Sequence, residues 1–464
     1  MLSSLFLPLI IVIPLLSLLA LFLLGEDRSH DVVKASAVLV FIATLATVFQ
    51  GSSSFILPYL ASVGISLHLV VNSFNSILLI MAAIVYLAAS LVGDYFIKRN
   101  RKMYGLFFLL AEASSLGVFL SYNLFMFYVF WEISEIMMFF FIFVYGGTMR
   151  RYAAFKFIIY SLTSSLLLLI GIMLIYANVN PHTFDLSLLM QSAQTIQPGM
   201  QLGISVLLLI SFMIKMPVFP FHSWLPDAHT EAPTTGSMIL AGVLLKFGGY
   251  GLLLLLSMLP VARHYSLYIM AFAVFSTVYS ALAAIKQSNI KRAIAYTSIT
   301  DMGIIAVGLA AYNALGSMGA LYGMLSHGIA ISLLFLIAGT LNETYNTFDI
   351  NKIKGVIANF TDMTYLFIIG ALAAIGIPLT SGFIGDILIF LGSYGTFGLI
   401  GLLPITGILL IGAMMLWIIE RVFVSRKETE PYAEPDRSVL YSGSMLLFFS
   451  ILFGIVPFIL LGFR

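Results

Sequence analysis

Five ionisable side chains lie within long apolar stretches of the chain: Glu132, Lys215, Lys246, His327 and Asp386. A charged side chain at the centre of a lipid bilayer costs roughly 3 kcal/mol. Such residues therefore usually face the interior of a helix bundle, where they bind or pass ions. Carboxyl, amine and imidazole groups in one bundle can take up and release protons in turn. The residue types therefore favour transport of protons or other cations.

The two lysines enclose the most unusual segment of the sequence, KMPVFPFHSWLPDAHTEAPTTGSMILAGVLLK. Prolines stand two and five residues after Lys215, and each removes a backbone donor. We therefore expect a helix to break where this lysine points into the bundle. Broken helices at mid-membrane depth usually line a hydrated cavity. The segment also supplies two accessory candidates for ion transfer, His222 and His229.

Three further acidic residues lie in the same kind of stretch: Glu112, Glu135 and Asp301. Glu135 follows Glu132 by three residues, so the two lie on roughly the same helical face. A buried glutamate could instead cap a neighbouring backbone or pair with a stray lysine. A role in ion transfer is favoured over this alternative for Glu132 and is left open for Glu112 and Glu135. Glu112, Glu135 and Asp301 are accessory candidates.

Two of the main candidates also have plain structural alternatives. His327, in MLSHGIA, could be a core histidine bonded to a backbone carbonyl. Asp386 follows Pro378 in GIPLTSGFIGD and could cap the second half of a broken helix, where the helix dipole favours a carboxylate. The surrounding set of buried ionisable groups favours a place in a proton relay for both residues.

The composition identifies a membrane protein. The chain has 464 residues, of which 61% are hydrophobic and only 9% are charged, and these values exclude an ordinary soluble domain and a disordered chain. Cysteine is absent, which excludes disulfides, thiolate zinc sites and iron–sulfur clusters on this chain. Any redox centre must therefore belong to a partner, and no nucleic-acid partner is expected.

Apolar runs of about 20 residues can cross a hydrocarbon core about 30 Å thick, and they predict an all-α polytopic fold with about fourteen transmembrane helices. The runs lie at roughly 2–24, 33–50, 68–97, 104–121, 123–147, 152–177, 202–221, 235–259, 266–285, 290–312, 316–341, 361–391, 396–424 and 438–462. The first run is expected to be a retained helix, because it lacks the basic region and the cleavage site of a signal peptide.

The seventh and twelfth of these helices both contain helix-breaking residues, and they cross the membrane in opposite directions. Paired interruptions of this kind predict two inverted repeats of five helices, the fourth to eighth and the ninth to thirteenth. We expect four parts: N-terminal scaffold helices at 1–103, a first repeat at 104–259, a second repeat at 260–424 and a last helix at 425–464.

Lysine and arginine predict the orientation, because short cytoplasmic loops are enriched in both. Of the 22 basic residues, only Arg263 and Arg464 fall on the opposite side, while Lys215 and Lys246 lie within the membrane. The other basic residues fall in loops on one side: Arg28, Lys34, Lys98, Arg99, Arg101, Lys102, Arg150, Arg151, Lys156, Lys286, Lys291, Arg292, Lys352, Lys354, Arg421, Arg426, Lys427 and Arg437. Both termini are therefore expected on the outer side of the cell membrane.

These motifs resemble the antiporter-like subunits of respiratory complex I, of Mrp sodium/proton antiporters, and of related membrane-bound hydrogenases and sulfane reductases. The resemblance covers most of the fourth to twelfth helices. It is carried by the segment between the two lysines together with NLFMFYVFWE, IKRAIAYTSITDMG, HGIAISLLFLIAGTL and GIPLTSGFIGD. The chain would be the shorter type of subunit, since it ends right after the fourteenth helix.

The resemblance implies a role for each main candidate. Glu132 matches a glutamate thought to pair with the lysine that is Lys215 here. Lys246 matches a central lysine and precedes two glycines that are expected to loosen its helix, and His327 matches a relay histidine. Asp386 stands where relatives have lysine or glutamate, as the terminal group of the relay.

Asp301 departs further from the family pattern, because relatives tend to have histidine or glutamine before the Met-Gly pair. A buried carboxylate there would either add a station to the relay or alter its ion selectivity.

The favoured function is translocation of protons or sodium by a membrane subunit of a redox-driven complex related to complex I. Homologous antiporter-like subunits would be its partners in the bilayer. A soluble redox arm would carry iron–sulfur clusters, with nickel–iron in the hydrogenase case. The alternatives are a subunit of a non-redox Mrp-type antiporter and an inert membrane scaffold, and the buried charges argue against the scaffold. Whether the chain serves an enzyme depends on these partners.

Overall fold

Long helices form most of the chain, as the apolar runs predict. The computed structural model describes residues 2–60, 63–426 and 429–461. In these residues, thirteen helical stretches are long and apolar enough to cross a membrane, and helix α3 adds a shorter apolar helix of 17 residues. The predicted all-α membrane fold with about fourteen crossings is confirmed. Lys427 and Arg464, which were assigned to opposite sides of the membrane, lie outside the described residues.

The helices of the first part are α1 (Leu2–Leu23), α2 (Ser29–Phe49), α3 (Asn75–Leu91), α4 (Gly93–Phe96), α5 (Arg101–Leu120), α6 (Leu124–Tyr145), α7 (Arg150–Asn178), α8 (Leu186–Ser192), α9 (Pro198–Lys215), α10 (Trp224–Glu231), α11 (Thr234–Ile239) and α12 (Leu245–Met258). Those of the second part are α13 (Pro260–Arg263), α14 (Ser266–Ile285), α15 (Ile290–Ala311), α16 (Ala314–Tyr345), α17 (Thr361–Ala374), α18 (Ser381–Phe397), α19 (Ile405–Ile418), α20 (Arg437–Ile455) and α21 (Phe458–Leu461). Two π-helical turns are η4 (Leu240–Leu244) and η7 (Ile419–Val424), and short 3-10 turns are η1 (Glu26–Arg28), η3 (Ala193–Thr195), η5 (Val356–Ala358) and η6 (Gly398–Leu402).

A β-hairpin is an element that the sequence analysis missed. Strands β1 (Ser53–Leu60) and β2 (Ile65–Val71) pair in antiparallel fashion. The predicted start of the third helix at residue 68 is therefore wrong, and α3 begins at Asn75. The Asn72 side chain accepts hydrogen bonds from the backbone amides of Phe74 and Asn75, which fixes this start. A short apolar run does not distinguish strand from helix by hydrophobicity alone.

Both predicted helix breaks are present. The first separates α9 from α10 and contains Pro217 and Pro220, and the second separates α17 from α18 and contains Pro378. Trp224 Nε1 donates a hydrogen bond to the Ile214 carbonyl at 3.1 Å, which ties the two halves of the first broken helix together. Asp227 of α10 accepts from Lys156 at 2.7 Å and from Arg292 at 2.9 Å. Side chains of α7 and α15 therefore hold the second half in place.

Helix α12 is irregular before Lys246, not after it. The π-helical turn η4 leads directly into α12, which continues without interruption through Gly248 and Gly249. A Cβ at Gly248 would come within 2.8 Å of the Met216 amide, and one at Gly249 within 2.6 Å of the Met324 sulfur. The expectation that these glycines loosen the helix is therefore wrong. They let α12 approach α9 and α16 closely.

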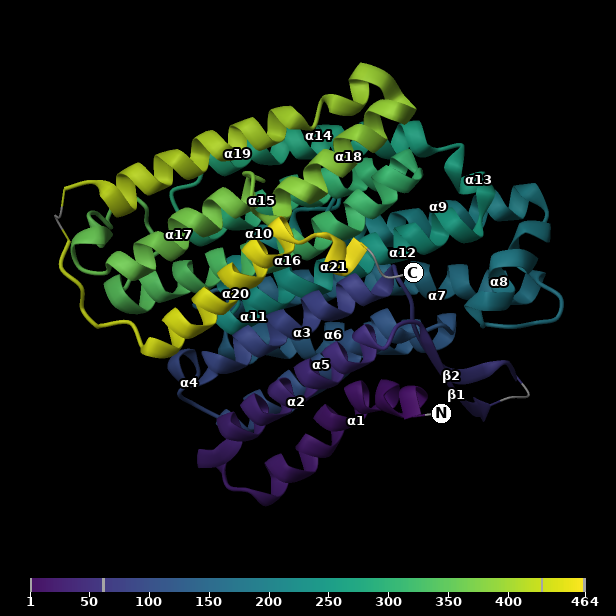
Figure 1. Ribbon diagram of the computed structural model, residues 1–464, viewed down its shortest axis with the longest axis horizontal. Helices are drawn as coiled ribbons and strands as arrows, with labels where there is room; N and C mark the ends of the chain where they lie inside the picture. The colour runs from purple at the N-terminus through teal and green to yellow at the C-terminus, as the bar shows by residue number, and fades with distance from the viewer. Residues whose placement is uncertain (1, 61–62, 427–428, 462–464) are drawn as a thin grey trace.

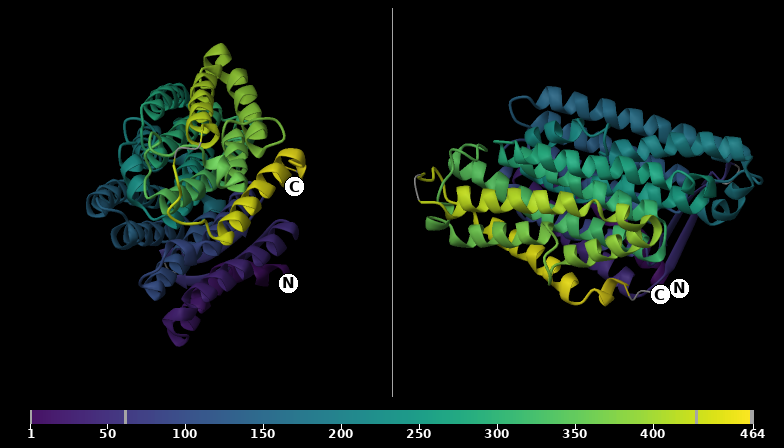
Figure 2. Two further views of the ribbon diagram at one scale, coloured as in Figure 1. Left: turned by 90° about the vertical axis from the view of Figure 1, so that its left-hand side faces the viewer. Right: turned by 90° about the horizontal axis from the view of Figure 1, so that it is seen from above.

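Helix α16 runs through the middle of the bundle and packs against α3, α11, α15, α17, α18 and α20. The N-terminal helices α1 and α2 lie on one side of this core, and α17 to α19 lie on the other (Figure 2). Both chain ends lie toward the same end of the bundle as the hairpin and α8, whereas α4 lies at the opposite end (Figure 1). His327 lies on α16 itself, and Asp301 and Asp386 lie on α15 and α18, which pack against it.

Candidate functional site

Lys215 is the last residue of α9 and lies directly before the break. Its Nζ donates a hydrogen bond to Glu135 Oε1 of α6 at 2.6 Å, and the two side chains are 1% and 0% exposed. The rings of Trp131, Phe157 and Phe247 surround the amine, with centroids 5.7, 5.6 and 5.9 Å away. Breaking such a buried pair strands a charge in a low-dielectric interior, so its two members depend on each other.

The expected pairing of Lys215 with Glu132 is wrong. Helix α6 turns Phe127, Trp131 and Glu135, which are four residues apart, toward the core. Glu132 is only half-buried at the edge of this face, where its carboxylate interacts with the hydroxyl of Tyr128. Packing of the aromatic rings sets the rotation of α6, and the spacing of the two glutamates did not reveal it. A part for Glu132 in ion transfer remains a prediction.

Lys246 and His327 form a second buried contact. Lys246 Nζ lies 2.6 Å from His327 Nδ1 on α16 and also donates to the Ala241 carbonyl in the π-helical turn, at 2.5 Å. His327 Nε2 has no hydrogen-bond partner among the described residues. The alternative that a backbone carbonyl satisfies this histidine is therefore wrong. Interruptions of the π type are frequent at functional sites.

A small cavity continues from His327 toward the second broken helix. It has a volume of about 20 Å³ and is lined by Asp301 of α15, Ser326 and His327 of α16, and Asp386 of α18. Asp301 Oδ2 lies 3.8 Å from His327 Nε2, which is too long for a direct hydrogen bond. The structure thus brings Lys246, His327, Asp301 and Asp386 into one cluster.

Asp386 does not cap its helix. Thr380 is the N-cap residue of α18, so Asp386 lies more than one turn inside the helix. A Cβ at Gly376, whose φ is +70°, would come within 2.3 Å of Asp386 Oδ2, so the carboxyl packs directly against the break. The glycine provides the space that the carboxyl occupies at the edge of the cavity.

A second set of polar residues near Lys246 includes His229, close to the C-terminal end of α10. His229 is fully buried, stacks on Phe335 with ring centroids 4.5 Å apart, and interacts electrostatically with Lys291 and Lys246. Neither of its ring nitrogens has a hydrogen-bond partner in the described part of the chain. Among the five accessory candidates, His229 and Asp301 therefore lie beside Lys246 or His327.

Lys291 is a functional candidate that the sequence analysis missed, because it was counted as a loop residue. It lies in the first turn of α15, is 2% exposed, and donates a hydrogen bond to the Ala232 carbonyl. It also lines a polar pocket of about 220 Å³ with Glu231 and Glu343. The sequence signal that could have identified Lys291 is its position in IKRAIAY, at the start of an apolar helical run.

Two accessory candidates are placed apart from these contacts. Glu112 of α5 is fully buried, and Ser36 of α2 donates a hydrogen bond to its Oε2 at 3.3 Å. His222 lies in the break after α9, where its ring packs against Phe219 and Tyr279. Neither residue contacts the lysines, so their parts in ion transfer stay predictions.

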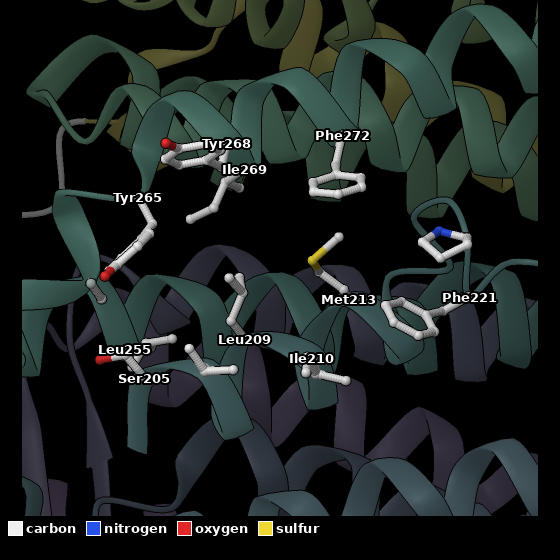
Figure 3. Close-up of a pocket in the computed structure, with 13 residues that line it drawn as sticks. Ser205, Leu209, Ile210, Met213, Phe221, Leu255, Tyr265, Tyr268, Ile269 and Phe272 are labelled. Carbon is white, nitrogen blue, oxygen red and sulfur yellow. The ribbon is translucent and has the colours of Figure 1, made fainter. Parts of the chain in front are cut away.

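An apolar pocket between α9 and α14 is unsuited to ions. It has a volume of about 280 Å³ and lies between α9 and α14, where Leu209 and Met213 face Tyr268 and Phe272 (Figure 3). Its accessible walls are apolar. The polar contacts of the two lysines therefore form the candidate site.

The site can hold and pass protons. Amines, imidazoles and carboxyls alternate from α6 and α9 through α12 and α16 to α15 and α18, and all of these groups exchange protons. Within residues 2–60, 63–426 and 429–461, no group of three or more His, Cys, Asp or Glu residues is arranged to hold a metal ion.

Comparison with known proteins agrees with this arrangement. The family described as NADH:quinone oxidoreductase/Mrp antiporter, transmembrane, matches residues 121–412, which is more than half of the chain and spans Glu132 to Asp386. The chain belongs to this family. The antiporter family match thus confirms the resemblance drawn from the motifs.

Relatives and solved structures of the antiporter family extend the match to nearly the whole chain. The NADH-quinone oxidoreductase subunit M of Rickettsia conorii is 34% identical over 467 residues, covering 96% of this chain and 94% of that protein. A chain of respiratory complex I from Thermus thermophilus superposes with a TM-score of 0.89 at 25% identity, covering 98% of this chain and 96% of the other. A chain of an archaeal membrane-bound sulfane sulfur reductase shares the fold, with a TM-score of 0.87 at 23% identity and coverages of 97% and 76%.

Proposed function

We propose that the chain translocates protons, sodium ions or both as an antiporter-like membrane subunit of a redox-driven complex related to complex I. The observation that carries this proposal is the contact between Lys246 and His327. It joins an amine at the centre of the bundle to a cavity that holds two carboxyls. An inert scaffold has no need of such costly buried groups.

The pair of Lys215 and Glu135 would act as the switch of this relay. At 2.6 Å, a Glu135 carboxylate attracts the Lys215 ammonium strongly. Movement of α6 relative to α9 by a few ångström would weaken that attraction, since Coulomb energy falls with distance. A partner subunit could therefore load and unload Lys215 by electrostatics alone. Protons would then pass among Lys215, Lys246, His327 and Asp386 through buried water.

The proposed orientation places both termini on the outer side of the cell membrane. It is supported by the basic residues near α4 and at the start of α5, because short cytoplasmic loops are enriched in lysine and arginine. These elements lie at the end of the bundle opposite to the chain termini (Figure 1). In this orientation, the polar pocket beside Lys291 opens toward the cytoplasm.

The proposed partners follow from the relatives and from the missing cysteines. Homologous antiporter-like subunits would lie beside this chain in the bilayer, and a soluble arm would perform electron transfer. Iron–sulfur clusters, with nickel–iron in a hydrogenase, would be held by those partners, since this chain has no cysteine. Metal analysis of the purified complex would distinguish the cases: iron with nickel indicates a hydrogenase, and iron alone another reductase.

The decisive experiment measures ion gradients formed by the intact complex in vesicles. Lys246→Ala should keep assembly and electron transfer but lose the gradient, whereas Lys286→Ala, at an exposed lysine, should behave like the wild type. A full gradient in the Lys246 variant would remove this residue from the pathway. Ion exchange by a complex without any electron donor would indicate the Mrp-type alternative. A wild-type complex that transfers electrons without any ion movement would indicate a scaffold.

A further inference from the structure

Asp301 and Asp386 both line the small cavity beside His327, although they come from different helices, and they interact electrostatically. The cavity of about 20 Å³ is large enough for one water molecule and too small for several. Asp386 and Lys246 are the charged groups that act on Asp301 electrostatically. The ionisable groups at this place are therefore Asp301 on α15, Asp386 on α18, His327 on α16 and Lys246 on α12.

The contact with Lys246 sets the tautomer of His327 whenever Lys246 is protonated. A protonated lysine is only a donor, so in that state Nδ1 of His327 accepts, and the proton of the neutral ring lies on Nε2. Nε2 lines the cavity and has no hydrogen-bond partner among the described residues. The 3.8 Å between Nε2 and Asp301 Oδ2 suits a bridging water better than a direct bond. The His327 Nε2–H donor and the carboxyls of Asp301 and Asp386 thus lie around a space that fits one water molecule.

The two carboxyls cannot both carry a charge at little cost. One carboxylate is balanced by Lys246, but a second one would add a like charge in a site with little water. Two neighbouring carboxyls in this situation titrate as a pair and retain one proton between them. The Asp386 carboxyl packs against Gly376. The backbone at the helix break therefore helps to hold this carboxyl beside the cavity.

We propose that Asp301 and Asp386 share one exchangeable proton and form the terminal station of the relay. This inference rests on the proposed function and deepens it, because it names the proton as the ion handled at this end. A sodium ion is a poor fit here. The N–H of the His327 imidazole would point its positive end at such a cation.

Infrared spectroscopy of the intact complex tests the shared proton. A protonated carboxyl has a C=O stretch that an ionised carboxylate lacks, and carbon-13 labelling of aspartate carboxyls separates it from the buried glutamates. The variants are Asp301→Asn, Asp386→Asn and the double variant. Asp362→Asn, at an exposed aspartate in the first turn of α17, is the matched control.

Each single variant should lose the signal of one protonated aspartate, because the remaining carboxyl can ionise once no second carboxylate lies beside it. The double variant should lose no more than either single variant, and the control should lose none. Additive losses would show two separately protonated groups, and no loss would show two ionised groups; either result would overturn the proposal. Sodium chloride should leave the signal unchanged, and its displacement by sodium would also count against a proton site.

A variant that conserves the carboxyl guards against a folding defect. Asp386→Glu should shift the C=O band while keeping its intensity, and loss of the band in an assembled complex would contradict the shared proton. This spectroscopic result does not require ion transport. A complex that forms no gradient can still show the shared proton, and a pumping complex can lack it, so the two proposals fail separately.

Discussion

Lys215 on α9 and Glu135 on α6 are joined by a contact of 2.6 Å in an almost completely buried place, although 80 residues separate them in the chain. Glu132, which the resemblance to antiporter-like subunits implied as the partner of Lys215, is half-buried outside this contact. The residue that neutralises Lys215 is therefore not the one that the motif indicates.

A double-mutant cycle should show that Glu135 and Lys215 act as one unit. Glu135→Gln strands the Lys215 charge and should destabilise the protein by about 3–5 kcal/mol, the usual cost of breaking a buried pair. Lys215→Met in the same chain should recover part of this loss, because no charge is then left unpaired. Thermal unfolding of the detergent-solubilised complex is the measurement.

Glu132→Gln is the matched comparison for this cycle. Its effect on stability should be small and additive with that of Lys215→Met, because Glu132 does not contact Lys215. Strong coupling to Glu132 instead of Glu135 would show that the pair in the working complex differs from the pair seen here.

Lys291 should control the supply of protons to Lys246. Lys291→Met removes the amine that lies between the polar pocket and His229, so the rate of ion transfer should fall about tenfold, an effect of about 1.4 kcal/mol on the barrier. Lys286→Met, at an exposed lysine five residues earlier, should leave the rate unchanged. Initial rates of gradient formation in vesicles provide the comparison, and equal rates in the two variants would exclude this route.

Gly385 should be intolerant of a side chain, because α18 crosses α16 at this glycine beside Asp386. A Cβ at Gly385 would come within 2.8 Å of the Gly323 backbone amide, and backbone cannot move aside easily. Gly385→Ala should therefore destabilise the protein by about 1–3 kcal/mol and lower the ion gradient.

Gly395→Ala on the same helix is the control for Gly385→Ala. Its nearest neighbour would be the Asn313 side chain at 4.0 Å, so the variant should be neutral or slightly stabilising. Thermal unfolding and gradient formation should be measured on both variants. Equal tolerance of the two alanines would contradict the close crossing of α16 and α18.

Asp185 should make the loop before α8 sensitive to acid. Burial acts to raise the pKa of Asp185, but hydrogen bonds from the His68 side chain and from Ser187 outweigh it and hold the pKa below its usual 3.8. A carboxyl whose pKa is lower in the folded state stabilises it fully above the unfolded pKa, and this contribution is lost as the pH falls through the folded value.

Hydrogen exchange of the α8 amides measures this contribution. Asp185→Asn should lower their protection at pH 7, because asparagine still caps the helix but cannot pair with His68, which contacts Asp185 at 2.6 Å. The difference from the wild type should stay constant down to about pH 4 and shrink below it. A difference that persists unchanged at lower pH would show that charge plays no part.

The sequence alone determined the membrane fold, the two helix breaks and most of the ionisable residues of the site. Long apolar runs can only be stable as helices in lipid, since every backbone polar group must be satisfied internally. Proline removes a backbone donor whatever surrounds the helix. The breaks near Pro217 and Pro378 could therefore be located without knowing how the helices pack. Charges within apolar runs are visible in the same way, and this is why Lys215, Lys246, His327 and Asp386 were found.

Only the tertiary structure decided which of these groups touch. The choice of Glu135 over Glu132 depends on the rotation of α6, which Phe127 and Trp131 fix by packing against other helices. The burial of Lys291 and the meeting of Asp301 with Asp386 depend on how α15 lies against α10 and α18. Helical spacing defines a face but not what that face meets, because contacts between distant segments arise from the packing of the whole bundle.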